Sequence, residues 1–266
     1  MAIQRVSAGR GAAWINQGFG LLKNGGKAVW LPALVVGVLA SLPVLGAAFG
    51  ILIVFFYGGL VLCFNRPGGG FDAFSGFRDG GFARLLPVML MNVALAIIAV
   101  LALWPVLQPI LQAASEGREA TPDEALAFLG GLAGPLLWLI PLSILVHWIS
   151  QFAVPLATLR RLPGGEALAL ALKAVFANLP ALLVNLLCLV IACVVIAVIA
   201  FIPMAILGVL FAGSPTLANL AVLPVAALLT TVLMVLMGGN MLFAYRDVFG
   251  DPADAAADAT PGELLL

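Results

Sequence analysis

Long uncharged stretches, separated by short charged clusters, make up most of this chain. Every Asp, Glu, Lys and Arg falls in one of five clusters, at 1–27, 65–84, 116–124, 160–173 and 246–263. A membrane-spanning helix needs about 20 apolar residues, because about 30 Å of hydrocarbon must be crossed at about 1.5 Å per residue. The pattern therefore predicts membrane helices in the uncharged stretches and loops at the clusters.

Six spans fit into these stretches. The stretch 28–65 is too long for one span and carries Pro43 and Gly46, so it predicts a tight hairpin of two short helices. The stretch 179–245 divides at the polar residues 213–216. The predicted spans are about 28–42, 44–64, 85–105, 132–158, 180–203 and 220–244. We expect an all-α polytopic transmembrane bundle of six helices arranged as three hairpins, with short cytoplasmic amphipathic helices.

The chain is expected to form a single transmembrane domain over 1–250. Residues 251–266 are acidic and rich in Ala, Asp and Pro, which predicts a disordered tail. Orientation follows from the basic residues, since short translocated loops are depleted of Lys and Arg. Of the 12 Lys and Arg, all but Arg118 fall on one side of the six-span arrangement. This partition predicts a multi-pass protein of a bacterial inner membrane with both termini in the cytoplasm.

Composition agrees with a membrane location and excludes some functions. The chain is 64% hydrophobic and 9% charged, whereas about a quarter of the residues in a soluble domain are charged. A net charge of zero disfavours nucleic acid as a partner, because its binders need a basic face. The three cysteines lie in apolar stretches without metal-ligand spacing, and there is one histidine. No metal or cofactor is expected.

A repeat is visible within the apolar stretches. Residues 23–32 match residues 78–87 position for position, each with a basic residue, a Gly-Gly pair and a Leu-Pro entry into a span. A third copy enters at Asn178-Leu179-Pro180. The predicted unit is an amphipathic cytoplasmic segment, an outgoing helix and a returning helix, used three times. The leading segments are expected at about 11–23, 71–78 and 165–177.

Three short motifs carry a resemblance to a known family. They are the leader containing Trp14, the Gly-Phe-x-Leu-Leu-Lys run at 18–23 and the closing segment 243–249. With the Leu-Pro entry of the fifth span, they resemble the BPSS-type family of uncharacterised proteobacterial inner-membrane proteins. The chain is more distantly similar to YciC-type proteins and to the membrane domain beside some glycerophosphodiester phosphodiesterases. The resemblance implies fold and location, with no catalytic residues to carry over.

Amide side chains fall at one depth in four of the predicted spans. Polar residues inside a membrane are candidates for a functional site. The candidates for this polar layer are Asn92, Gln151, Asn185 and Asn240, with Tyr57 on a fifth span. Two interpretations stay open: a site for a substrate or lipid headgroup, or interhelical hydrogen bonds, worth about 0.6 kcal/mol each.

The fourth span carries a second candidate. Ser143, His147 and Gln151 recur every four residues and therefore share one helix face. A histidine there could contact a ligand or relay protons. The alternative is a structural histidine, because no Asp or Glu lies within any predicted span to act as a partner.

These observations favour a non-enzymatic envelope scaffold or regulator, because the spans carry no catalytic constellation. The alternative is a transporter or lipid-handling protein that uses the polar layer. The expected partners are the lipid bilayer and a membrane-protein partner or second copy of the chain. A transporter should have a water-accessible cavity reaching the amides, whereas a scaffold should have them paired across packed helices.

Overall fold

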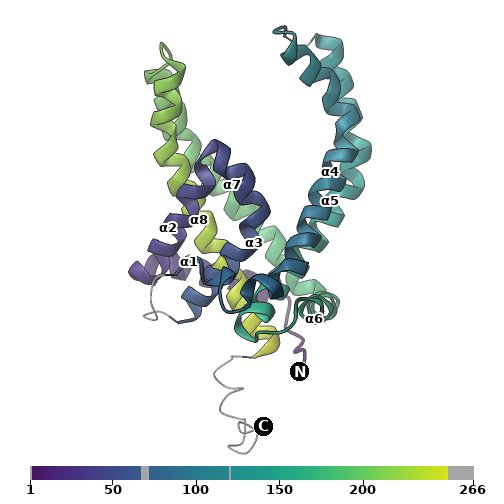
Figure 1. Cartoon of the computed structure of the whole chain (residues 1–266), viewed down its shortest axis with the longest axis vertical. Helices are drawn as coiled ribbons and strands as arrows, with labels where there is room; N and C mark the ends of the chain where they lie inside the picture. Colours follow the sequence, from purple (N-terminus) through teal and green to yellow (C-terminus); the bar gives the residue numbers. More distant parts are fainter. Residues whose placement is uncertain (1, 67–71, 120, 251–266) are drawn as a thin grey trace, which may run out of the picture. The chain divides into compact units, whose positions relative to one another are not determined.

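A computed structural model describes residues 2–66, 72–119 and 121–250, without the side chains of 43–48 and 215. Within these residues all regular elements are helices (Figure 1). They are α1 (Arg10–Asn24), α2 (Gly26–Ser41), α3 (Pro43–Asn65), the short 3-10 helix η1 (Ser75–Phe77), α4 (Gly81–Ser115), α5 (Pro122–Leu159), α6 (Gly164–Ala177), α7 (Leu179–Leu210) and α8 (Pro215–Phe249). The predicted tail lies outside the described residues.

Four helices are long and apolar enough to cross a membrane, namely α4, α5, α7 and α8. This confirms the all-helical class and agrees with an integral membrane protein. The pair α1 and α2, bent by 102°, passes the same test only if counted as one broken span. The 16 residues of α2 rise about 24 Å, short of the hydrocarbon thickness of about 30 Å. Six spans in three hairpins therefore stay a prediction.

The described residues form two compact units, one made of those up to Met89 together with those from Ile149 onward, and one made of those from Leu90 to Trp148. The single transmembrane domain thus stays a prediction as well. In the larger unit, α8 is the common partner of α1, α2, α3 and α7 (Figure 1). Helix α1 turns one stripe inward, because Gly11, Trp14, Ile15 and Gly18 recur at helical spacing and are all buried.

Glycines set the close contacts of this unit. A Cβ on Gly11 would overlap the carbonyl oxygen of Ala181 on α7, and one on Gly37 of α2 would overlap the hydroxyl of Thr231 on α8. Such small residues let helix backbones approach closely, which is the usual packing device in membrane bundles. The predicted amphipathic segments at 11–23 and 165–177 correspond to α1 and α6.

The smaller unit contains the acidic turn between α4 and α5. Arg118 forms ion pairs with Glu116 at 2.8 Å and with Glu124 at 2.8 Å. The hydrogen bond from Arg118 lowers the pKa of the Glu116 carboxyl, with a smaller contribution from Gln112. A carboxyl with a lowered pKa in the folded state stabilises the turn above the ordinary glutamate pKa, and the effect is lost as pH falls through the lowered value.

An Arg118→Gln variant is expected to raise the pKa of Glu116 toward the ordinary value of glutamate, because the charge-assisted hydrogen bond is lost. A carbon-13 NMR titration of the glutamate carboxyls measures this change. Arg5→Gln, which removes an exposed cation of the other unit, is the control. An unchanged Glu116 titration in Arg118→Gln would contradict the pairing.

Candidate functional site

Two of the predicted amides lie together in the core of the larger unit. Asn185 on α7 donates to Asn240 Oδ1 on α8 at 2.8 Å, and Asn240 donates back to Asn185 Oδ1 at 3.3 Å. Asn185 also donates to the carbonyl oxygen of Gly11 at 3.0 Å. Both side chains are 1% exposed. This reciprocal pair joins three helices, and none of the side chains that line the described pockets belongs to it.

The other predicted residues are placed differently. Gln151 is fully buried in the larger unit, and neither of its amide atoms has a hydrogen-bond partner among the described residues. Tyr57 is half-buried in the same unit. The remaining three belong to the unit of residues 90–148: Asn92 and His147 are half-buried and Ser143 is exposed. These placements leave the role of each a prediction.

Polar side chains in the last two turns of α8 are also paired by hydrogen bonds to residues far away in the sequence. Asp247, in the last turn of α8, accepts from Arg10 at 2.6 Å and from the indole of Trp14 at 2.6 Å. Arg160 donates to the Tyr245 hydroxyl at 2.7 Å. These bonds tie α1 and the end of α5 to α8.

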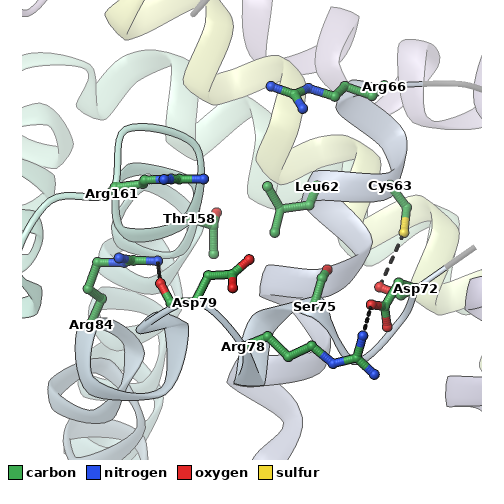
Figure 2. A pocket seen from close by; sticks show the side chains of 10 residues that line it. All are labelled: Leu62, Cys63, Arg66, Asp72, Ser75, Arg78, Asp79, Arg84, Thr158 and Arg161. Carbon is green, nitrogen blue, oxygen red and sulfur yellow. Dashed lines mark hydrogen bonds and ion pairs between the residues drawn. The ribbon is translucent and has the colours of Figure 1, made fainter. Parts of the chain in front are cut away.

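A polar cavity of about 350 Å³ lies where α3 ends, α4 begins and α5 ends (Figure 2). All of its lining residues belong to the larger unit. We call it the arginine pocket; it is lined by Leu62, Cys63, Arg66, Asp72, Ser75, Arg78, Asp79, Arg84, Thr158 and Arg161.

The segment 72–80 forms one wall of the arginine pocket because it lies closely on α3. A Cβ on Gly59 would overlap the carbonyl oxygen of Ala73, and one on Gly76 would overlap that of Phe55. Stacked aromatic rings add to the contact between α3 and this segment: the ring centroid of Phe55 lies 4.8 Å from that of Phe77. Only residues without a side chain at 59 and 76 permit this approach.

Four arginines and two aspartates line the pocket, which leaves an excess of two positive charges. Asp72 is neutralised by Arg78 at 2.8 Å. Arg84 donates to the carbonyl oxygens of Ala157 at 3.1 Å and Asp79 at 2.9 Å, which fixes its position without cancelling its charge.

The other two arginines are open to a ligand. Arg66, after α3, and Arg161, after α5, extend toward the cavity from opposite sides (Figure 2). Neither guanidinium makes a hydrogen bond or ion pair with the residues that the structure describes. The hydroxyl of Ser75 is buried and likewise lacks a partner among them. Donors without internal acceptors suit an oxyanion.

Backbone conformation also marks this site. In the described part of the chain, the two non-glycine residues with positive φ are Asp79 at 51° and Arg161 at 54°, and both line the arginine pocket. Such conformations persist where the surroundings over-determine them, and they gather at ligand sites.

The prediction from sequence missed this pocket. Its arginines were used to orient the spans and to mark the repeat, although basic residues at the ends of three predicted spans were the available signal for a pocket. Within the described residues, no three His, Cys, Asp or Glu side chains form a group that could hold a metal ion. No family model, curated protein or solved structure matches the chain.

Proposed function

We propose that this protein is a non-enzymatic inner-membrane protein that binds a phosphate-bearing lipid headgroup in the arginine pocket. The observation that carries the proposal is the pair of open guanidinium groups of Arg66 and Arg161 at the ends of apolar helices. The proposal combines the two hypotheses drawn from the sequence. It takes lipid handling from the alternative, and it takes the absence of catalysis from the scaffold or regulator.

The chemistry of the pocket supports a phosphate ligand. A guanidinium group presents paired N–H donors that match two phosphate oxygens, and it stays charged at all physiological pH values. Basic pockets between membrane helices on the cytoplasmic side are typical headgroup sites. The eleven-to-one distribution of basic residues supports a cytoplasmic position for this one.

The surroundings of the pocket support a lipid as the source of the phosphate. Leu62 lines the cavity itself, and the rings of Phe74 and Phe82, which flank the 75–81 segment, are 42% and 48% exposed. Exposed phenylalanine rings can insert into the boundary between the headgroups and the acyl chains of a membrane. A phospholipid can place its phosphate between the arginines and its acyl chains beside these apolar groups.

The Asn185–Asn240 pair argues against a transport route through the amides. Each amide already satisfies the other inside packed helices, so a substrate there would have to displace those bonds. A membrane-protein partner or a second copy of the chain is compatible with headgroup binding and stays part of the proposal.

Binding of dioctanoyl phospholipids to the full-length protein in a neutral detergent tests the proposal. Wild type is expected to bind dioctanoyl phosphatidylglycerol saturably and to bind dioctanoylglycerol, which lacks phosphate, at least about tenfold more weakly. The Arg66→Gln/Arg161→Gln variant is expected to lose at least about tenfold in phospholipid affinity, because two charge-assisted contacts disappear. Native mass spectrometry measures both.

Arg5→Gln is the matched control, since Arg5 is an exposed cation of the same unit outside the pocket. It should bind phospholipid as wild type does. Equal binding of dioctanoylglycerol, or unchanged affinity in the double arginine variant, would refute the proposal.

A further inference from the structure

We propose that the headgroup bound in the arginine pocket carries a primary ammonium beside its phosphate. This inference rests on the proposed function, because it concerns the other end of the same headgroup. Its basis is Asp79, whose carboxylate points into the cavity and away from Arg84 (Figure 2). An acid directed into a basic pocket needs a reason, since it weakens the binding of any simple anion.

The two aspartates of the pocket differ in how they are used. The carboxylate of Asp72 accepts from Arg78 at 2.8 Å and from the backbone N–H of Phe74 at 3.1 Å. Asp79 uses only its backbone carbonyl, which accepts from Arg84 at 2.9 Å. In the part of the chain that the structure describes, no donor reaches the Asp79 carboxylate. Its acceptor oxygens are therefore available to a ligand.

The backbone of Asp79 is held in a turn at the wall of the pocket. Asp79 and Gly80 are both left-handed, with φ of 51° and 73°. The N–H of Gly81 closes the turn by donating to the carbonyl oxygen of Arg78 at 2.7 Å. The carbonyl oxygen of Asp79 also accepts from Arg84. Because the turn holds the Asp79 backbone at the cavity wall, a ligand has to order only the carboxylate itself on binding.

Together, the arginines and Asp79 match a zwitterionic phosphodiester. Arg66 and Arg161 take the phosphate, and Asp79 accepts a charge-assisted hydrogen bond from a primary ammonium on the same headgroup. A headgroup ending in hydroxyls can donate hydrogen bonds to Asp79 but carries no positive charge to pair with the carboxylate, and a quaternary ammonium has no N–H to donate. Every phospholipid offers a phosphate to the arginines, and Asp79 then favours those whose headgroup carries a primary ammonium.

Competition between headgroups on the same acyl chains tests this selection. Full-length wild type in a neutral detergent is expected to bind dioctanoyl phosphatidylethanolamine about tenfold more tightly than dioctanoyl phosphatidylglycerol or phosphatidylcholine. Asp79→Asn should bring the three affinities within about twofold of one another while phosphate-dependent binding persists. Glu166→Gln, which removes an exposed acid of α6, should keep the wild-type preference.

Two outcomes overturn the inference while leaving the phosphate site in place. One is wild-type binding of the glycerol or choline headgroup as tight as that of ethanolamine. The other is an ethanolamine preference that survives in Asp79→Asn, because another group would then recognise the ammonium. The wild-type comparison needs no variant, so a poorly folding Asp79→Asn does not prevent the test. Failure of the proposed function is distinct, since no phospholipid would then depend on Arg66 and Arg161.

Discussion

A Gly76→Ala variant is expected to lose the arginine pocket while keeping its long helices. The added Cβ would overlap the carbonyl oxygen of Phe55 and lie 3.1 Å from the backbone nitrogen of Gly59. Backbone atoms of α3 cannot rotate away, so the 72–80 segment must lift off that helix, at a cost of about 1–3 kcal/mol. Ser75, Arg78 and Asp79 would move with it. We expect at least about a tenfold loss of phospholipid affinity with an unchanged far-ultraviolet circular dichroism spectrum.

Gly165→Ala supplies the matched control, because a Cβ there meets nothing within 4 Å. It should leave both the affinity and the spectrum as in wild type. If Gly76→Ala bound phospholipid as tightly as wild type, the close contact between the 72–80 segment and α3 would not be what shapes the pocket.

The second large effect is expected at the buried amide pair. Asn185→Leu removes the partner of Asn240 and the donor to the Gly11 carbonyl, both in the core. Leaving a buried polar group unpaired costs about 1–3 kcal/mol, whereas replacing both partners by apolar groups costs less. Asn185→Leu and Asn240→Leu should therefore each lower the free energy of unfolding, and the double variant should lose less than their sum. Unfolding in mixed detergent micelles measures all three.

Asn219→Leu serves as the control for this cycle, since Asn219 is an exposed amide on the same helix, α8. It should leave the free energy of unfolding within about 0.5 kcal/mol of wild type. Strictly additive losses in the double variant would show that the two amides do not stabilise the fold as a pair.

Hydrophobic run length predicted the long helices but not where they end. The span expected over 85–105 lies inside α4, which continues to Ser115 through Pro105 and Pro109. A proline removes one helical hydrogen bond and crowds the preceding turn, yet a helix can continue through it. At the other end, α4 begins at Gly81, before the charged Arg84 that was taken as the boundary. The length of an apolar run predicts only the part of a helix that could cross the hydrocarbon. It does not predict how far the helix continues beyond that part.

The sequence predicts a depth along the helix for each polar residue, but it does not predict the rotation about each helix axis. The rise per residue places Asn185, Asn240 and Gln151 at similar heights. Which of them face each other depends on helix packing, and only Asn185 and Asn240 bond reciprocally. The arginine pocket was harder still to foresee, because its residues come from three segments, of which the glycine contacts at 59 and 76 bring two together.

The central position of α8 bears on the order in which the fold can be completed during synthesis. Helices α1 and α2 leave the ribosome first, yet α8, the last described helix, is a principal packing partner of both. Until α8 has been synthesised, Arg10 and Trp14 lack Asp247, and Asn185 lacks Asn240. These pairings join residues far apart in the sequence, so the packing of the larger unit can be completed only after α8 is made.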